Sequence, residues 1–230
     1  MIDPFRFLIH LMKYGRHLSF CGRLRRIVTV EWVRPYIKAA NRILEVGAGD
    51  GQTTCFLARR FQNKDFVVCE KNEKQLEKLS GRMQKKRLRN VRVVKGSLAE
   101  CEELGLFDFL FAVDVLEHIE DDYAALVQMK ALLKSGDNLF LHVPACGVDV
   151  FDDPDHVRPG YEQEGLSALL AKAGFEIKRM EYTFGRRGVD YHHSRIHLSK
   201  FRRAMVHLLD LADDAKVKSS IGVVATKAGL

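Results

Sequence analysis

Three glycines at alternate positions, Gly47, Gly49 and Gly51, follow the short apolar run Arg42–Val46. An apolar run that ends in glycines is typical of a buried strand that enters a tight turn. The residues that follow, Thr53–Phe61, have the apolar spacing of a helix. Because glycine lets a backbone turn sharply and approach a ligand closely, this segment predicts a strand, a ligand-binding loop and a helix in that order.

The rest of the chain repeats the alternation of short apolar runs with helical spacing. The expected strands are Arg42–Val46, Asp65–Glu70, Val91–Val94, Phe107–Val113, Asn138–Pro144, Phe175–Tyr182 and Ile221–Thr226. The expected helices are Thr53–Phe61, Glu73–Arg87, Asp121–Lys134, which Ser135 and Gly136 should end, and Tyr161–Ala173. Strands that alternate with helices of this length predict an α/β fold with a doubly wound, mostly parallel, seven-stranded sheet.

Two segments fall outside this alternation and define the expected domain organisation. Residues 1–40 form a basic, helical extension, either a lid over the pocket or a surface contact, and residues 41–230 form one domain. An insertion at 183–218, with a helix near Leu198–Leu211, precedes the last strand. Such additions usually cover the ligand crevice at the carboxyl ends of the strands.

The net charge of +7 arises entirely in residues 1–42, because residues 43–230 contain equal numbers of basic and acidic side chains. A second basic run, Lys78–Lys95, contains no acid. Basic segments attract nucleic acid, anionic lipid or anionic substrates, but neither run has interleaved aromatic residues for base stacking. A solvated surface is therefore favoured over nucleic-acid binding. The apolar and basic residues of Phe5–Arg26 leave peripheral membrane contact as an alternative to a lid.

Five cysteines, with no C-x-x-C spacing, favour reduced buried thiols over a zinc ribbon or a disulfide framework. The chain has neither a membrane-spanning apolar run nor a recognisable secretory signal, so we expect a cytoplasmic protein. Nothing in the sequence indicates the oligomeric state.

The glycine loop does not have the spacing expected for a dinucleotide. In G-x-G-x-x-G counted from Gly47, the third glycine position is Gln52. The pattern present is E-x-G-x-G-x-G, from Glu45 to Gly51, which favours a smaller, zwitterionic ligand over a pyrophosphate. Glu70 stands 21 residues after Gly49, at the end of the second strand. A carboxylate there can accept hydrogen bonds from both hydroxyls of a ribose.

These residues resemble motifs of the class I S-adenosylmethionine-dependent methyltransferases. The glycine loop resembles their motif I, Glu70 their motif II acid, and Asp114–Ile119 (DVLEHI) the fourth-strand motif of the small-molecule type. The segment from Asp155 to Gly174 also resembles theirs, so the resemblance covers residues 40–182. It implies a Rossmann-like methyltransferase fold and S-adenosylmethionine as cofactor. The implied cofactor-binding residues are Glu45, Gly47, Ala48, Gly49, Gly51, Glu70, Lys71, Ser97, Leu98 and Asp114.

One position departs from this family pattern. An acid often follows the third-strand glycine and contacts the adenine amino group, but here the sequence reads Gly96-Ser97-Leu98. Serine offers a neutral hydrogen-bond partner in its place. Glu100 or Glu102 could supply the missing carboxylate.

Acceptor methylation on oxygen or nitrogen requires a group that removes a proton, and two histidines are candidates. His118 follows the fourth strand, but Glu117 and His118 could instead cap the next helix. His156 lies in a polar loop after the fifth strand, and that loop could simply be exposed to solvent. Arg158, in the same loop, is a candidate anion clamp. His142 lies in an apolar strand and is expected to belong to the core, and Asp114 could order its loop instead of binding a ligand.

The insertion provides further candidates, with Tyr191 and His192 expected to contact substrate. His192, His193 and His197, with Asp190, could suggest a metal, but no H-E-x-x-H pattern is present, and we expect no metal site.

Three functions are compatible with these residues. The first is methylation of oxygen or nitrogen on a small-molecule acceptor by in-line displacement. The second is methylation of RNA or protein through the basic segments, although no Asn/Asp-Pro-Pro-Tyr motif or RNA-binding module is present. The third is a non-catalytic scaffold that keeps the cofactor loop, which the intact set of glycines and acids disfavours. The identity of the acceptor is not encoded in any motif that we recognise.

Overall fold

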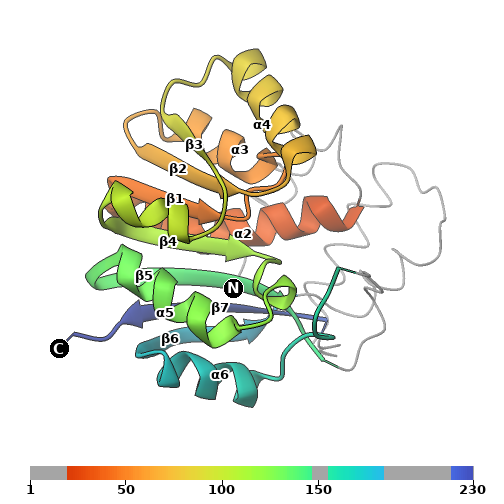
Figure 1. Ribbon diagram of the computed structural model, residues 1–230, viewed down its shortest axis with the longest axis vertical. Coiled ribbons are helices and arrows are strands. Elements are labelled where there is room, and N and C mark those ends of the chain that lie inside the picture. Colours follow the sequence, from red (N-terminus) through yellow and green to blue (C-terminus); the bar gives the residue numbers. More distant parts are fainter. Residues whose placement is uncertain (1–19, 147–154, 184–218, 230) are drawn as a thin grey trace.

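The computed structural model describes residues 20–146, 155–183 and 219–229 of the chain. Within these residues seven strands form one sheet in the order β3-β2-β1-β4-β5-β7-β6, with helices on both faces (Figure 1). The strands are β1 Arg42–Val46, β2 Asp65–Glu70, β3 Val91–Lys95, β4 Phe107–Val113, β5 Leu133–Pro144, β6 Phe175–Tyr182 and β7 Ser220–Lys227. The helices are α2 Phe20–Ala39, α3 Gln52–Arg60, α4 Glu73–Lys86, α5 Asp122–Leu132 and α6 Gln163–Lys172, with short 3-10 helices η1 Ala99–Leu104 and η2 Leu116–His118.

The strand directions confirm the expected doubly wound, mostly parallel sheet. β1 to β5 pair in parallel, whereas β7 runs antiparallel to both β5 and β6. The strand order reverses at β1, which lies between β2 and β4. In open α/β sheets ligands bind beyond the carboxyl ends of the strands at such a reversal, so the glycine loop after β1 occupies the expected position.

Alternate side chains of each central strand enter two separate cores because successive residues of a strand point to opposite faces. Leu44 and Leu110 belong to the core on one face, together with residues of α5 and α6. Ile43 and Phe109 belong to the core on the other face, with residues of α2, α3 and α4. All four side chains are fully buried. The near-continuous apolar strands of the sequence therefore reflect burial on both faces.

The largest difference from the expected boundaries lies between α5 and β5, and the other expected strands and helices that the structure describes begin and end within two residues of the expectation. Helix α5 was expected to extend to Lys134 and to end at Gly136, but it ends at Leu132, and Leu133 already has the extended backbone that begins β5. Leu133 is fully buried and pairs with Phe107, with a register shift between that residue and Phe109. Burial of Leu133 against the sheet outweighs its helical propensity, and the positive φ of Gly136 accommodates an irregularity inside β5.

The N-terminal extension is helical where the structure describes it, as expected, because α2 covers residues 20–39. Residues 1–19 and the insertion 184–218 lie outside the described residues, so neither the lid nor the surface contact is tested. In the part of the chain that is described, no helix is long and apolar enough to cross a membrane. Cys55, Cys69 and Cys101 are buried free thiols, as expected, and Cys146 is half-buried and free.

Candidate active site

The glycine loop adopts three left-handed backbone conformations in five residues. Gly47, Gly49 and Gly51 have φ angles of +67°, +54° and +71°. A Cβ at Gly47 would overlap the side chain of Val115, and one at Gly51 would overlap Leu79, so these two glycines permit close packing. A Cβ at Gly49 would meet nothing within 4 Å among the described residues. The loop therefore faces open space at Gly49, where a ligand can approach the backbone.

The carboxylate of Glu70 joins the ends of β1 and β2. Its Oε2 accepts a 2.7 Å hydrogen bond from Gly49 N, and its Oε1 accepts a 2.8 Å bond from Asn72 N. The residue is only 8% exposed. Each oxygen keeps a further lone pair for a ligand hydroxyl, so the geometry is compatible with the expected ribose contact, which remains a prediction.

Glu45 is a buried acid beside the loop. It is 4% exposed, and its Oε2 has no hydrogen-bond partner among the described residues. Burial, followed by the negative charges of Glu70 and Asp50, raises the pKa of Glu45 well above its usual value. A backbone hydrogen bond from Thr54 lowers the pKa only in part. A buried carboxyl oxygen without a partner is costly, and a cationic ligand group beside Oε2 would reduce that cost.

An ion pair that the sequence did not reveal braces the loop from α4. Arg82 Nη2 lies 2.7 Å from Asp50 Oδ2, and Arg82 Nε donates a 2.9 Å bond to the Asp50 carbonyl. Arg82 belongs to the basic run that was interpreted as a solvated surface. The pairing depends on the packing of α4 against α3, which no local pattern encodes.

A carboxylate lies beside Ser97, the residue that departs from the family pattern. Glu100 Oε2 accepts hydrogen bonds from Ser97 N at 2.6 Å and from Ser97 Oγ at 2.8 Å. These bonds lower the pKa of Glu100. Of the two acids suggested as substitutes for the missing carboxylate, Glu100 is therefore the one that contacts Ser97. The side chain of Leu98 is buried in the core, and that of Lys71 is exposed.

Asp114, immediately after β4, forms a network with β5 and α2. It has a φ of +51°, and its Oδ1 lies 2.8 Å from Nδ1 of the fully buried His142, while Oδ2 lies 2.5 Å from Arg25 Nε. The Nε2 of His142 lies 3.1 Å from Thr183 Oγ1. Burial alone would raise the pKa of Asp114, but Arg25 and then His142 outweigh it and lower the pKa.

This network bears on the roles that were expected for His142 and Asp114. His142 is a core residue, as expected, but it is also a polar link between β4 and the end of β6. The signal available for it was a histidine near the carboxyl end of an apolar strand. Both oxygens of Asp114 are occupied by Arg25 and His142, so a contact of Asp114 with the cofactor remains a prediction beside its loop-ordering role.

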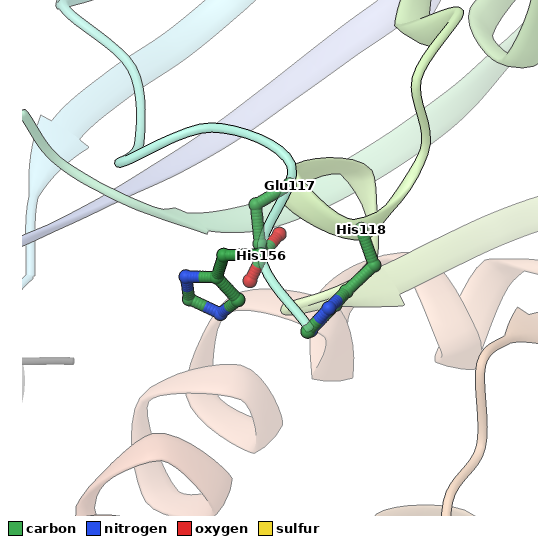
Figure 2. A group of neighbouring side chains, drawn as sticks. All are labelled: Glu117, His118 and His156. Carbon is green, nitrogen blue, oxygen red and sulfur yellow. The ribbon is translucent and has the colours of Figure 1, made fainter. Parts of the chain in front are cut away.

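The two candidate bases lie next to each other. The rings of His118 and His156 meet edge to face with centroids 4.6 Å apart, and Glu117 lies beside them (Figure 2). Glu117 is fully buried, and neither of its carboxyl oxygens has a hydrogen-bond partner among the described residues. Burial and then the negative Asp114 raise the pKa of Glu117 to about 8. The side chain that caps α5 is that of Asp121, which accepts a 2.8 Å bond from Ala124 N, rather than Glu117 or His118.

Arg158 holds the histidine loop against the end of β4. Its guanidinium donates hydrogen bonds to the carbonyls of Leu116, Ile119 and Glu120 at 2.7–2.8 Å and to the hydroxyl of Tyr161 at 2.9 Å. The donors of Arg158 are thus engaged with the protein itself, and its role as an anion clamp stays a prediction. Tyr191 and His192, the other expected substrate contacts, lie outside the described residues.

Comparisons with known proteins agree with the fold. A family model described as a methyltransferase domain matches residues 43–136. (S)-coclaurine N-methyltransferase of Papaver somniferum is 27% identical over 108 residues, which cover 47% of this chain and 31% of that enzyme. The chain therefore spans about a third of the length of this curated relative.

Two solved structures extend the comparison of the fold. One is the O-methyltransferase of a trans-AT polyketide synthase multienzyme from Brevibacillus brevis in complex with S-adenosyl-L-homocysteine, with a TM-score of 0.63, 14% identity and coverage of 88% of this chain and 72% of that one. The other is the [4+2]-cyclase SpnF, with a TM-score of 0.63, 21% identity and coverage of 89% and 80%. At these identities the likeness establishes the fold alone.

The matched residues and the strand order define the class of fold: the chain has the Rossmann-like fold of the class I S-adenosylmethionine-dependent methyltransferases, and residues 43–136 are similar to a methyltransferase domain. S-adenosylmethionine is the cofactor that this domain implies, and the residues present fit it. A Cβ at Gly49 would meet nothing within 4 Å among the described residues, the Glu70 carboxylate is compatible with the predicted ribose contact, and Oε2 of Glu45 has no hydrogen-bond partner there that would exclude a cationic group.

Proposed function

We propose that this chain methylates an oxygen or nitrogen of a small-molecule acceptor with S-adenosylmethionine as donor. One observation carries the proposal. The open glycine loop follows β1, and the Glu117, His118 and His156 cluster lies beyond its parallel neighbour β4, with Val115 packed against Gly47 between them. This arrangement supports a donor site beside a group of candidate proton acceptors at the carboxyl ends of the central strands.

S-adenosylmethionine supplies an electrophilic methyl group, whose bond to sulfur breaks as the bond to the acceptor forms, leaving a neutral thioether. The chain has to align the acceptor, exclude water and take the proton that the acceptor loses. His118 is oriented for the last task. Its Nδ1 lies 2.9 Å from the carbonyl oxygen of Asp155, which can only accept, so Nδ1 carries the hydrogen and Nε2 keeps a lone pair.

A small acceptor is favoured by the DVLEHI motif and by the names of the relatives above. The first test is calorimetric titration of the full chain with S-adenosylmethionine and S-adenosylhomocysteine. It should be followed by a labelled-methyl screen of phenols, amines, sugars and RNA. We expect both cofactor forms to bind and a small phenol or amine to be labelled. The proposal would be overturned if neither cofactor form binds. If RNA alone is labelled, the acceptor is a nucleic acid and not a small molecule.

A further inference from the structure

Three potential ligand side chains meet beyond the carboxyl end of β4. One donor atom from each of Glu117, His118 and His156 lies within 4.8 Å of the other two (Figure 2). Glu117 and His118 belong to η2, and His156 belongs to the loop that precedes α6. One carboxylate and two imidazoles converge here, although His156 stands 39 positions after Glu117 in the sequence.

Glu117 lacks the partner that a buried acid requires. Its side chain is fully buried, and neither Oε1 nor Oε2 forms a hydrogen bond within the described residues. Buried charges in proteins are normally paired or coordinate metals. A cation at this point would supply the missing partner for the carboxylate.

The histidine on the same 3-10 helix has its ring orientation set by the backbone. Nδ1 of His118 donates to the carbonyl of Asp155, which leaves the lone pair of Nε2 available as a ligand. Metal-ligating histidines nearly always donate their second ring nitrogen to a carbonyl or a carboxylate, because that bond fixes the tautomer and the ring orientation.

The two segments that carry the three residues are held together independently of any ligand. Val157 N donates a 3.0 Å bond to the carbonyl of Glu117, and Arg158 bonds the carbonyls on both sides of it. The neighbours of His156 are therefore fixed to those of Glu117 and His118. This arrangement preorganises the donor atoms, which lowers the cost of binding a cation.

We propose that Glu117, His118 and His156 bind one divalent transition-metal ion, Zn²⁺ or an ion of similar preference. Imidazole nitrogens favour such ions over Mg²⁺ and Ca²⁺, which prefer oxygen donors. Two histidines and one glutamate are also one of the three-ligand sets that leave a coordination position open. If the proposed function holds, His118 Nε2 would coordinate the ion instead of taking the proton itself, and an acceptor hydroxyl in the open position would lose its proton to water more readily.

Metal binding can be tested without measuring activity. The full chain, stripped with a chelator, is titrated with Co²⁺ while the visible absorption of the ion is recorded, and with Zn²⁺ in equilibrium dialysis. We expect one equivalent to bind and Zn²⁺ to raise the melting temperature, because a ligand that binds only the folded state stabilises it. Absence of binding by either ion would overturn the proposal.

Matched variants locate the site. Glu117→Gln and His156→Ala should each weaken Zn²⁺ binding by about a hundredfold or more, whereas Glu120→Gln, the same change at an exposed neighbour, should bind as the wild type does. The Glu117 and His156 variants must show cooperative unfolding before titration. Unchanged binding in both variants, or loss of binding on changing His193 and His197 instead, would contradict the assignment.

Failure of the metal site and failure of the proposed function remain distinguishable. The titration with S-adenosylhomocysteine reports on the glycine loop, and the Co²⁺ titration reports on Glu117, His118 and His156. A chain that binds the cofactor but no metal would retain the proposed function and lose only this inference.

Discussion

The carboxylate of Glu70 accepts a 2.7 Å hydrogen bond from the backbone N–H of Gly49, a residue 21 positions earlier in the chain. This bond ties the glycine loop after β1 to the end of β2, so one side chain both shapes the loop and faces the space beside it. The acid that the sequence suggested for ribose binding therefore also positions the backbone that would approach the cofactor.

Glu70→Ala should weaken S-adenosylhomocysteine binding by about tenfold or more, because a charge-assisted hydrogen bond contributes roughly 1.5–3 kcal/mol. Calorimetric titration measures the effect. Glu77→Ala, which removes an exposed carboxylate from α4, is the control and should bind normally. Equal affinity in the two variants would show that the ribose has been placed wrongly.

Substitutions of the glycines should separate packing from ligand approach. In Gly51→Ala the added methyl group overlaps Leu79 at a positive φ, so we expect a loss of about 2–4 kcal/mol in the free energy of unfolding. In Gly49→Ala only the left-handed backbone is penalised, by about 1–2 kcal/mol, but the methyl group enters the open space and should abolish most cofactor binding.

Gly81→Ala is the matched control for the glycine variants. It lies within α4, and a Cβ there meets nothing within 4 Å in the described structure. The change should stabilise the chain by about 0.5–1 kcal/mol without altering affinity. Urea denaturation and calorimetry of the three variants check the pattern, and a Gly49→Ala protein that binds the cofactor normally would refute the open-space argument.

The buried Glu45 should make stability depend on pH. Its pKa is raised in the folded state by burial and by Glu70 and Asp50. Its contribution is therefore fully present below its unfolded pKa of about 4.3 and is lost as pH rises towards the folded value. Relative to Glu45→Gln, the wild type should lose free energy of unfolding over a pH range that begins at about pH 4 and extends upwards. Denaturation of both proteins across this range measures the difference, and a constant difference would contradict the raised pKa.

Arg158→Ala should loosen the loop that carries His156. The guanidinium bonds three carbonyls around η2, and their loss should cost about 1–3 kcal/mol. Hydrogen exchange at Val157 N, which bonds the carbonyl of Glu117, should become faster. Arg158→Lys should not restore protection, because an ammonium group does not reproduce the planar fork. Unchanged exchange in Arg158→Ala would show that Arg158 does not hold the loop, and it would favour the anion-clamp role that the sequence suggested.

The fold could be predicted largely from local patterns. The run Arg42–Val46 and the run Phe107–Val113 are observed as strands with the expected bounds, because strands buried on both faces leave a strong apolar signal. Leu133 shows where such reasoning fails. Its helical neighbours and the following Gly136 favoured a longer helix, but pairing with Phe107, a residue distant in sequence, made it the first residue of β5.

By itself the sequence determined the class of fold, the glycine loop and the acid at Glu70, because backbone conformation and burial leave periodic, local marks. Only the tertiary structure decided that Glu100 reaches Ser97, that Arg25 and His142 occupy Asp114, and that Glu117 lies unpartnered beside His118 and His156. These relationships depend on the directions of side chains from different strands and loops. Electrostatic pairing across such distances becomes defined only when the sheet brings those strand ends together.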